Sequence, residues 1–129
     1  MQVNMLKAKI HRATVTGADI NYEGSIGIDE NLMNEADLLP NERVDVYNLS
    51  NGQRFSTYVI PAEKNSGSIV LNGAAARCVS VSDLVIIVAY CMVEEPELRS
   101  FKPNIIVLDG KNRVARGGRT RYIRQAFDS

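Results

Sequence analysis

Residues 44–60 read Val-Asp-Val-Tyr-Asn-Leu-Ser-Asn-Gly-Gln-Arg-Phe-Ser-Thr-Tyr-Val-Ile, and this stretch decides the class of fold. Two runs of alternating character, Val44–Leu49 and Arg54–Ile60, flank Asn51-Gly52. A period of two is typical of a strand with one buried face, and Asn-Gly favours the positive φ angles of a tight hairpin turn. We therefore predict a β-hairpin over these residues.

Much of the remaining chain also favours strands. Segments rich in β-branched or aromatic residues predict strands at Met5–Thr16, Ser68–Leu71, Leu84–Tyr90 and Ile105–Leu108. The run Leu84–Tyr90 is continuously apolar, which favours a core strand covered on both faces.

Helix is sparse. Asp29 is a suitable N-cap for one helix that Pro40 ends, and a short turn of helix is expected from Ala74 to Arg77. Many short strands and few helices favour a closed or nearly closed barrel, because closure removes exposed strand edges. We predict a single, mainly β domain over residues 1–129.

The composition argues against several classes of function. Fifteen Lys and Arg balance fifteen Asp and Glu, so we expect neither nucleic acid nor a membrane surface as a partner. No apolar run approaches the length of about eighteen residues that spans a membrane, and Met1–Arg12 lacks a secretory apolar region, so we expect a cytoplasmic protein. One His and the separated Cys78 and Cys91 offer no cluster with metal-ligand spacing.

The end of the chain is basic. Residues 111–129 carry six basic residues against one acidic residue, with Gly117-Gly118 in the middle, so we expect a weakly structured tail. An RNA-binding tail is the alternative, but aromatic residues for base stacking are few.

The step from Gly24 to Ser25 has two interpretations. One is a loop, because Gly allows unusual backbone angles and Ser hydrogen-bonds to nearby backbone. The other is a reactive peptide bond, because Ser25 Oγ can attack the Gly24 carbonyl carbon if the fold strains that peptide. An N-to-O acyl shift, β-elimination and hydrolysis would then leave a pyruvoyl group at position 25.

Four motifs in the same order resemble the bacterial aspartate 1-decarboxylase family: Lys9-Ile-His-Arg12, Tyr22-Glu-Gly-Ser25, Asn51-Gly52 with Arg54-Phe-Ser-Thr-Tyr58, and Asn72-Gly-Ala-Ala-Ala76. The resemblance runs from about residue 5 to residue 103. It implies a double-psi β-barrel that cleaves itself into a β chain, residues 1–24, and an α chain, residues 25–129. It also implies a homotetramer, which becomes a heterooctamer of α and β chains after cleavage.

The same resemblance implies the activity. It implies decarboxylation of L-aspartate to β-alanine and CO2, which supplies pantothenate and coenzyme A biosynthesis. The implied cofactor is a covalent pyruvoyl group derived from Ser25, with neither metal nor pyridoxal phosphate. The family's catalytic residues correspond to Ser25 and Tyr58.

The hairpin residues offer a physical rationale for these roles. Alternation places Arg54, Ser56 and Tyr58 on one face of a strand and Thr57 on the opposite face. Arg54 offers a planar fork for a carboxylate, and Tyr58 is expected to donate a proton. The resemblance nevertheless assigns Thr57 to both cleavage and substrate binding.

The remaining expected site residues come from three places. The resemblance places Lys9 near the second carboxylate of the substrate and assigns Gly73-Ala74-Ala75 to substrate binding, where backbone N–H groups at a helix start suit a carboxylate. Asn72 is expected to donate to the oxyanion of the acyl shift, alongside Gly24 and Ser25 in processing. His11 either supports the architecture or contacts the substrate.

Two other functions stay open on the residues alone. An uncleaved β-barrel that binds a peptide or small anion predicts an intact chain, because fold does not specify function. A hydrolase with Ser25 as nucleophile would need a His–Asp pair, and His11 alone is thin support. One methylene changes binding by only about 1–3 kcal/mol, so the sequence does not rank aspartate against glutamate.

Overall fold

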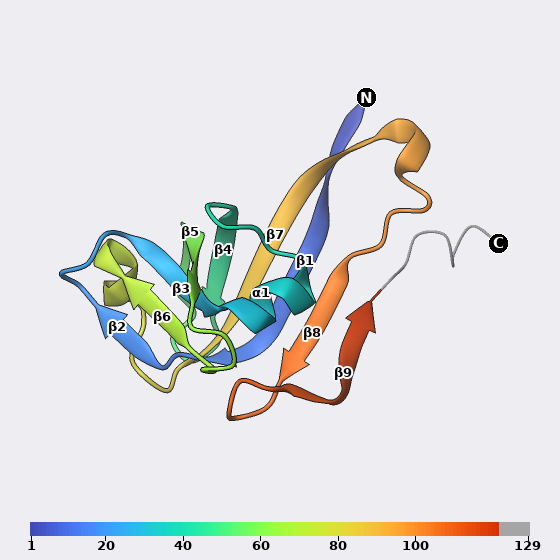
Figure 1. Cartoon of the computed structure of the whole chain (residues 1–129). Coiled ribbons are helices and arrows are strands. Elements are labelled where there is room, and N and C mark those ends of the chain that lie inside the picture. Colours follow the sequence, from blue (N-terminus) through green and yellow to red (C-terminus); the bar gives the residue numbers. More distant parts are fainter. Residues whose placement is uncertain (122–129) are drawn as a thin grey trace.

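A mixed β-sheet makes up most of the protein. The computed structural model describes residues 1–121, and over that part the strands follow the order β2-β6-β3-β5-β4-β7-β1-β8-β9 (Figure 1). The prediction of a mainly β protein with a few short helices is confirmed. The elements in chain order are β1 Gln2–Thr14, β2 Gly17–Asp19, β3 Ser25–Asp29, α1 Glu30–Ala36, β4 Arg43–Asn48, β5 Arg54–Ala62, β6 Ile69–Asn72, the 3-10 helix η1 Gly73–Cys78, β7 Leu84–Glu94, the 3-10 helix η2 Glu95–Glu97, β8 Asn104–Leu108 and β9 Val114–Arg121.

The strands do not follow one another around the sheet as a simple meander. The pairs β1–β8, β2–β6 and β3–β5 are parallel, and the other neighbouring strands are antiparallel. Parallel neighbours need crossover connections, so distant parts of the chain come to lie side by side. This interleaved winding agrees with the double-psi β-barrel that the resemblance implies.

The hairpin of β4 and β5 forms as predicted, but its turn is wider. The pairs run from Arg43 opposite Tyr58 to Tyr47 opposite Arg54. Asn48 N–H then donates to Gln53 O over 2.8 Å, which leaves four residues in the loop. Within that loop Gly52 alone has a positive φ, +78°, because the wider loop does not need the left-handed pair of a two-residue turn.

The central strand β7 pairs with β1 on one side and β4 on the other. Its alternate residues Val85, Ile87 and Ala89 are buried in the core, which confirms the prediction of a core strand. Val88 on the other face is also buried. The largest fully buried side chains around it belong to strands from both ends of the sheet and to α1: Ile10, Ile26, Ile28, Leu32, Ile69, Leu71 and Ile106.

Helix α1 begins as predicted and ends early. The Asp29 side chain accepts a hydrogen bond from Asn31 N–H, which is the N-cap interaction. The helix stops at Ala36, before Pro40, because Asp37 adopts a left-handed conformation with φ +62° and its N–H bonds back to the last turn. Leu39 is consequently exposed instead of lying on the helix.

The basic tail is structured further than expected. Residues 114–121 form β9, which pairs antiparallel with β8 from Leu108 opposite Val114 to Asn104 opposite Arg121. The prediction of a weakly structured tail is wrong for these residues, because β8 offers a free edge that a returning chain can pair with. The rest of the predicted tail, residues 122–129, lies outside the described part.

Candidate active site

A pocket of about 360 Å³ opens beside the first half of β5. Strand β3 pairs with β5 only from Ile26 opposite Val59 onward, so Gly24 and η1, rather than a strand, border residues 54–58 on that side. The pocket brings together five of the predicted site residues with three others: Gly24, Phe55, Ser56, Thr57, Tyr58, Ala74, Ala75 and Cys78.

Ser25 directly follows Gly24, which lines this pocket, and is the first residue of β3. Its side chain is buried, with 1% of the residue exposed, and it pairs with Asn72 across the β3–β6 ladder. Ser25 Oγ donates a hydrogen bond to Glu23 O over 3.1 Å and accepts one from Asn72 Nδ2 over 3.0 Å. The hydroxyl next to the Gly24 peptide is therefore held on two sides rather than free to rotate.

Asn72 contacts the nucleophile in the uncleaved chain. Its amide donates to Ser25 Oγ, whereas the role predicted from the sequence is donation to the oxyanion that forms during the acyl shift. The register of β3 and β6 accounts for the contact with Ser25, because directly opposite residues bring their side chains together.

Gly73 contacts the same segment from η1. Its φ is +66°, and a Cβ at this position would lie 2.7 Å from Gly24 N and Cα and 3.0 Å from Tyr22 O. A side chain would push the peptide of Gly24 away from η1. Besides the substrate-binding role expected for Gly73, there is a second reason for glycine at this position. The residue lies close to the segment before Ser25, where a side chain would not fit.

The two faces of β5 divide as alternation predicts. Arg54, Ser56 and Tyr58 are exposed, while Phe55 and Thr57 are half-buried. Thr57 therefore does face away from Tyr58, and both still line the pocket because it opens at the edge of the strand. No bulge is needed to bring them together.

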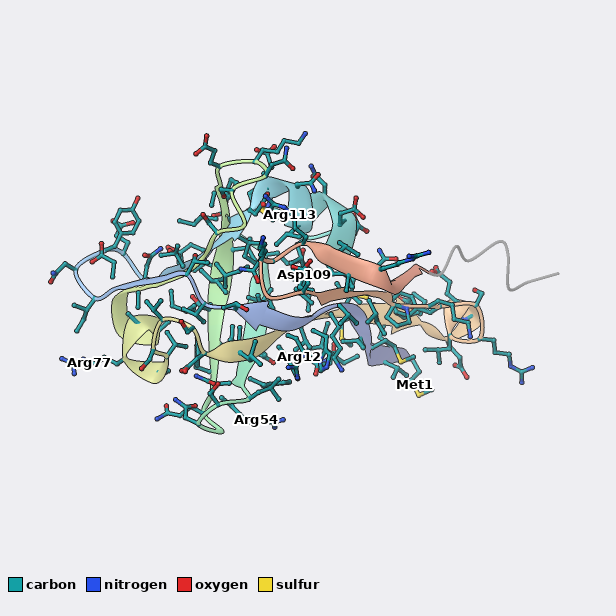
Figure 2. The ribbon with its side chains drawn as sticks, turned by 90° about the horizontal axis from the view of Figure 1, so that it is seen from below. Met1, Arg12, Arg54, Arg77, Asp109 and Arg113 are labelled. Atoms are coloured by element: carbon teal, nitrogen blue, oxygen red, sulfur yellow. The ribbon has the colours of Figure 1, made fainter. Side chains whose placement is uncertain are left out.

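Arg54 lies at the end of the hairpin (Figure 2). It lines an adjoining hollow of about 260 Å³ rather than the pocket itself. The two spaces share Phe55 and Ser56. The Arg54 guanidinium carbon lies 4.1 Å from the centroid of the Tyr47 ring. A carboxylate bound by Arg54 would thus lie next to the pocket that holds Tyr58.

Lys9 does not join the pocket within one chain. It lies opposite Val88 in the β1–β7 ladder, Val88 lies opposite Asp45, and Asp45 lies opposite Ser56. Three strand spacings of about 4.8 Å separate Lys9 from Ser56, or roughly 14 Å, which is more than a lysine side chain spans. The family role expected for Lys9 is therefore not explained by a single copy.

His11 lies near Lys9 on β1 and away from the pocket residues. Its Nδ1 is buried and has no hydrogen-bond partner among residues 1–121. Burial lowers the pKa of this imidazole, and the charges of Lys9 and Arg12 lower it further. His11 is therefore kept neutral at neutral pH.

Three residues of the site region were missed from the sequence. Phe55 shares a face with Thr57, two positions away, so strand alternation could have identified it. Tyr47 is opposite Arg54 in the hairpin, which the correct register would have shown. Cys78 carries no local signal, because it reaches the pocket only through the fold of η1.

The part of the chain that the structure describes, residues 1–121, contains no group of three or more His, Cys, Asp or Glu side chains that could hold a metal ion. None of its helices is long and apolar enough to cross a membrane.

Comparison with known proteins agrees with the geometry. A sequence model described as aspartate decarboxylase matches residues 1–115. The chain is 56% identical over 114 residues to an aspartate 1-decarboxylase from Syntrophus aciditrophicus, covering 88% of this chain and 98% of that protein. It is 54% identical over 114 residues to the Pelotomaculum thermopropionicum aspartate 1-decarboxylase, covering 88% and 86% respectively. The chain belongs to the aspartate decarboxylase family.

Among solved structures, the crystal structure of the computationally designed msDPBB_sym2 protein is similar with a TM-score of 0.40 and 19% identity. The match covers 67% of this chain and 96% of that one.

Proposed function

We propose that this chain cleaves its own backbone between Gly24 and Ser25 and then decarboxylates L-aspartate to β-alanine and CO2. The observation that carries the proposal is the buried Ser25 hydroxyl, held by Asn72 and Glu23 beside a pocket that Gly24, Thr57 and Tyr58 line. Membership of the aspartate decarboxylase family supports the same activity.

Cleavage begins with attack of Ser25 Oγ on the Gly24 carbonyl carbon. The bond from Gly24 C to Ser25 N breaks, and the Ser25 nitrogen takes up the proton as an ester forms. β-Elimination then removes the proton from Cα of residue 25, breaks the Cβ–Oγ bond and releases Gly24 as a carboxylate. The resulting dehydroalanine takes up water and loses ammonia, which leaves a pyruvoyl group at the new terminus. The Asn72 contact supports this proposal because it fixes the attacking oxygen.

The local structure fits such a group. Gly73 leaves room against the Gly24 segment that a side chain would fill, and Ala74 and Ala75 keep the neighbouring wall small. When present, the pyruvoyl group supplies a carbonyl that takes up the substrate's amine and the electrons left as CO2 departs.

The chain's own residues then bind the substrate and protonate it after CO2 has left. We propose that Arg54 holds one substrate carboxylate through paired N–H donors, and that the Tyr58 hydroxyl delivers a proton to the former α-carbon. Thr57, on the opposite face of β5, contacts both the Gly24 segment and the substrate. The pocket that contains Thr57 and Tyr58 supports this division.

We propose further that Lys9 acts from a neighbouring copy in a homotetramer. The distance of roughly 14 Å between Lys9 and Ser56 along the ladder supports a contribution across an interface rather than within a chain. Exposed Tyr90 and Met92 on the same sheet add apolar surface that assembly would bury.

The first test is an intact mass spectrum under denaturing conditions, taken before and after prolonged warm incubation. Two chains, one ending at Gly24 and one with a blocked terminus at position 25, are expected, followed by release of β-alanine from aspartate. A single chain with free Ser25 that stays whole, even with bacterial lysate added to provide a maturation factor, would contradict the proposal. That result would favour an uncleaved binding barrel.

A further inference from the structure

Arg54, Tyr47 and Tyr90 lie on three neighbouring strands and contact one another in that order. Arg54 lies directly opposite Tyr47 in the β4–β5 ladder, so both side chains rise from the same face of the sheet. The Arg54 guanidinium carbon is 4.1 Å from the Tyr47 ring centroid, within the range of a cation–π contact. The Tyr47 hydroxyl lies 3.1 Å from the hydroxyl of Tyr90 on β7.

This stacking leaves the hydrogen-bond donors of Arg54 available. A guanidinium that lies over a ring uses its flat face, whereas its N–H groups point outward in its own plane. None of the ion pairs found within residues 1–121 involves Arg54. Asp45, which lines the same hollow, instead accepts a hydrogen bond from Ser56 Oγ over 2.6 Å and lies 4.0 Å from Arg43 Nε.

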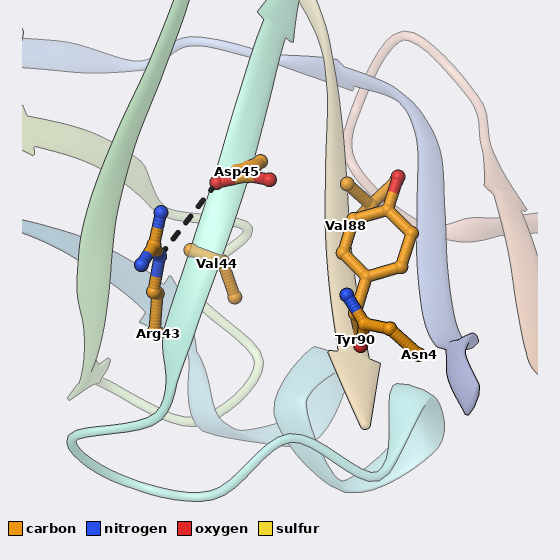
Figure 3. A pocket seen from close by; sticks show the side chains of 6 residues that line it. All are labelled: Asn4, Arg43, Val44, Asp45, Val88 and Tyr90. Carbon is orange, nitrogen blue, oxygen red and sulfur yellow. Dashed lines mark ion pairs between the residues drawn. The ribbon is translucent and has the colours of Figure 1, made fainter. Parts of the chain in front are cut away.

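The Tyr90 ring lies beside Asn4 at a hollow of about 270 Å³, with the ion pair of Arg43 and Asp45 on the neighbouring strand (Figure 3). The hydrogen bond with Tyr90 raises the pKa of Tyr47, and burial raises it further, so the Tyr47 phenol stays neutral.

We infer that Tyr47 is a positioning residue for Arg54 and that the Tyr90 hydroxyl holds the Tyr47 ring in place. The Tyr47 ring stacks against the flat side of the Arg54 guanidinium, so that the in-plane N–H donors point to a carboxylate at the edge of the pocket. The identity of that carboxylate as part of aspartate rests on the proposed function. The stack itself serves any small dicarboxylate that reaches Arg54.

Succinate is the probe, because it has two carboxylates and no amine and so binds without reacting. Its Kd is measured by calorimetry on the purified full-length protein and its variants. Tyr47→Leu is expected to weaken binding about fivefold, in line with a cation–π contact at a partly exposed site. Tyr90→Phe is expected to weaken succinate binding about twofold. Tyr47→Trp keeps a ring under Arg54 but also loses the hydroxyl contact with Tyr90, so its affinity is expected to lie within about twofold of wild type.

A double-mutant cycle separates positioning from general damage. Tyr47→Leu is expected to have no further effect in an Arg54→Ala background, because the ring then has no guanidinium to carry. Val81→Ala truncates an exposed side chain that lines neither the pocket nor either hollow, and it is expected to bind succinate normally. Additive losses in the cycle, or weak binding by the Tyr47→Trp protein, would overturn the inference.

Kinetics provide the second readout. With L-aspartate, Tyr47→Leu is expected to raise KM about fivefold while kcat and the extent of self-cleavage stay within about twofold of wild type. A loss confined to kcat would contradict a positioning role. If the wild-type protein neither cleaves itself nor makes β-alanine, the proposed function fails. The succinate measurements still test the inference, because equal succinate affinity of the wild type and of Arg54→Ala would contradict it.

Discussion

Ser25 is constrained by contacts that no isolated Gly-Ser step would have. Its hydroxyl is buried, accepts from Asn72 and donates to the backbone before Gly24, so attack on the adjacent carbonyl begins from a limited set of rotamers. Holding a nucleophile beside its target lowers the entropy that the reaction must lose. The chemistry proposed for this chain therefore depends on two side chains that are 47 positions apart in sequence.

Removing either partner is expected to affect cleavage differently. Ser25→Ala has no attacking oxygen, so the chain should stay whole in a denaturing mass spectrum at all times. Asn72→Ala keeps the nucleophile but loses its donor, and cleavage should slow about tenfold, the equivalent of about 1.4 kcal/mol in the barrier. Ser80→Ala, at an exposed site, is the control and should cleave at the wild-type rate. Cleavage of the Ser25→Ala chain at the same position would rule out this nucleophile.

Gly73→Ala should both destabilise the fold and slow cleavage. The new Cβ would meet Gly24 N and Cα at 2.7 Å, in addition to the cost of a left-handed φ. Gly52→Ala is a matched control, because Gly52 also has a left-handed φ, +78°, yet a Cβ there would meet nothing within 4 Å. Urea unfolding should show a loss of about 1 kcal/mol for Gly52→Ala and a larger loss for Gly73→Ala. Equal losses with normal cleavage would show that the Gly73 contact is unimportant.

At the scale of elements, Asp29 ties together three segments at the far end of β3 from Ser25. Its carboxylate accepts hydrogen bonds from the N–H groups of Asn31, Asn65 and Gly67, and Arg113 lies 3.9 Å away. Burial of Asp29 raises its pKa, but these hydrogen bonds and the Arg113 charge lower it by more, so the net pKa falls below 3.8. The strand that begins with Ser25 is thus anchored at its other end by an ionised carboxylate.

Asp29→Asn is expected to lower the free energy of unfolding by about 1–3 kcal/mol at neutral pH, because backbone donors lose a charged acceptor. A depressed folded pKa means that the stabilisation is fully present above pH 3.8 and is lost as pH falls through the folded value. The difference in the free energy of unfolding between wild type and Asp29→Asn, measured by urea titration, should therefore become smaller only at acid pH. Exposed Glu63→Gln is the control for the change of charge. A difference that does not vary with pH would contradict an ionised Asp29.

At the scale of the whole molecule, the wound sheet places Lys9 and the pocket on separate strands. The strands β4 and β7 lie between β1 and β5, and the same outer surface holds Tyr90 and Met92. We therefore propose that Lys9 takes part in substrate binding from another copy of the chain. Closed symmetric assembly would give every copy the same contribution.

Mixing two inactive proteins tests this arrangement. Lys9→Ala and Tyr58→Phe are each expected to lose most aspartate decarboxylation alone. Equal amounts, unfolded and refolded together, should regain about a quarter of wild-type activity, because random assembly gives some sites an intact Lys9 and an intact Tyr58 from different copies. Refolding each variant separately and then combining them without exchange is the control. No recovery from mixed assemblies of normal size would place Lys9 outside the site.

Local patterns were enough to predict most of the strands. Alternation in residues 44–60 predicted the hairpin and the exposed face of Arg54, Ser56 and Tyr58, because a strand's side-chain period does not depend on its neighbours. The N-cap of α1 at Asp29 was also local. The end of that helix was not, since a left-handed Asp37 is set by its surroundings as much as by its own preference.

The sequence by itself determined the mainly β class, the faces of β5 and the Gly24-Ser25 step as the place to look for chemistry. Only the tertiary structure decided that Asn72 hydrogen-bonds to Ser25 and that Gly73 contacts Gly24. It also decided that Tyr47 stacks against Arg54 and that Lys9 lies away from the pocket. The physical reason is that local periodicity sets which way a side chain faces, whereas strand order and register set what it faces, and those depend on pairing between residues far apart in the chain.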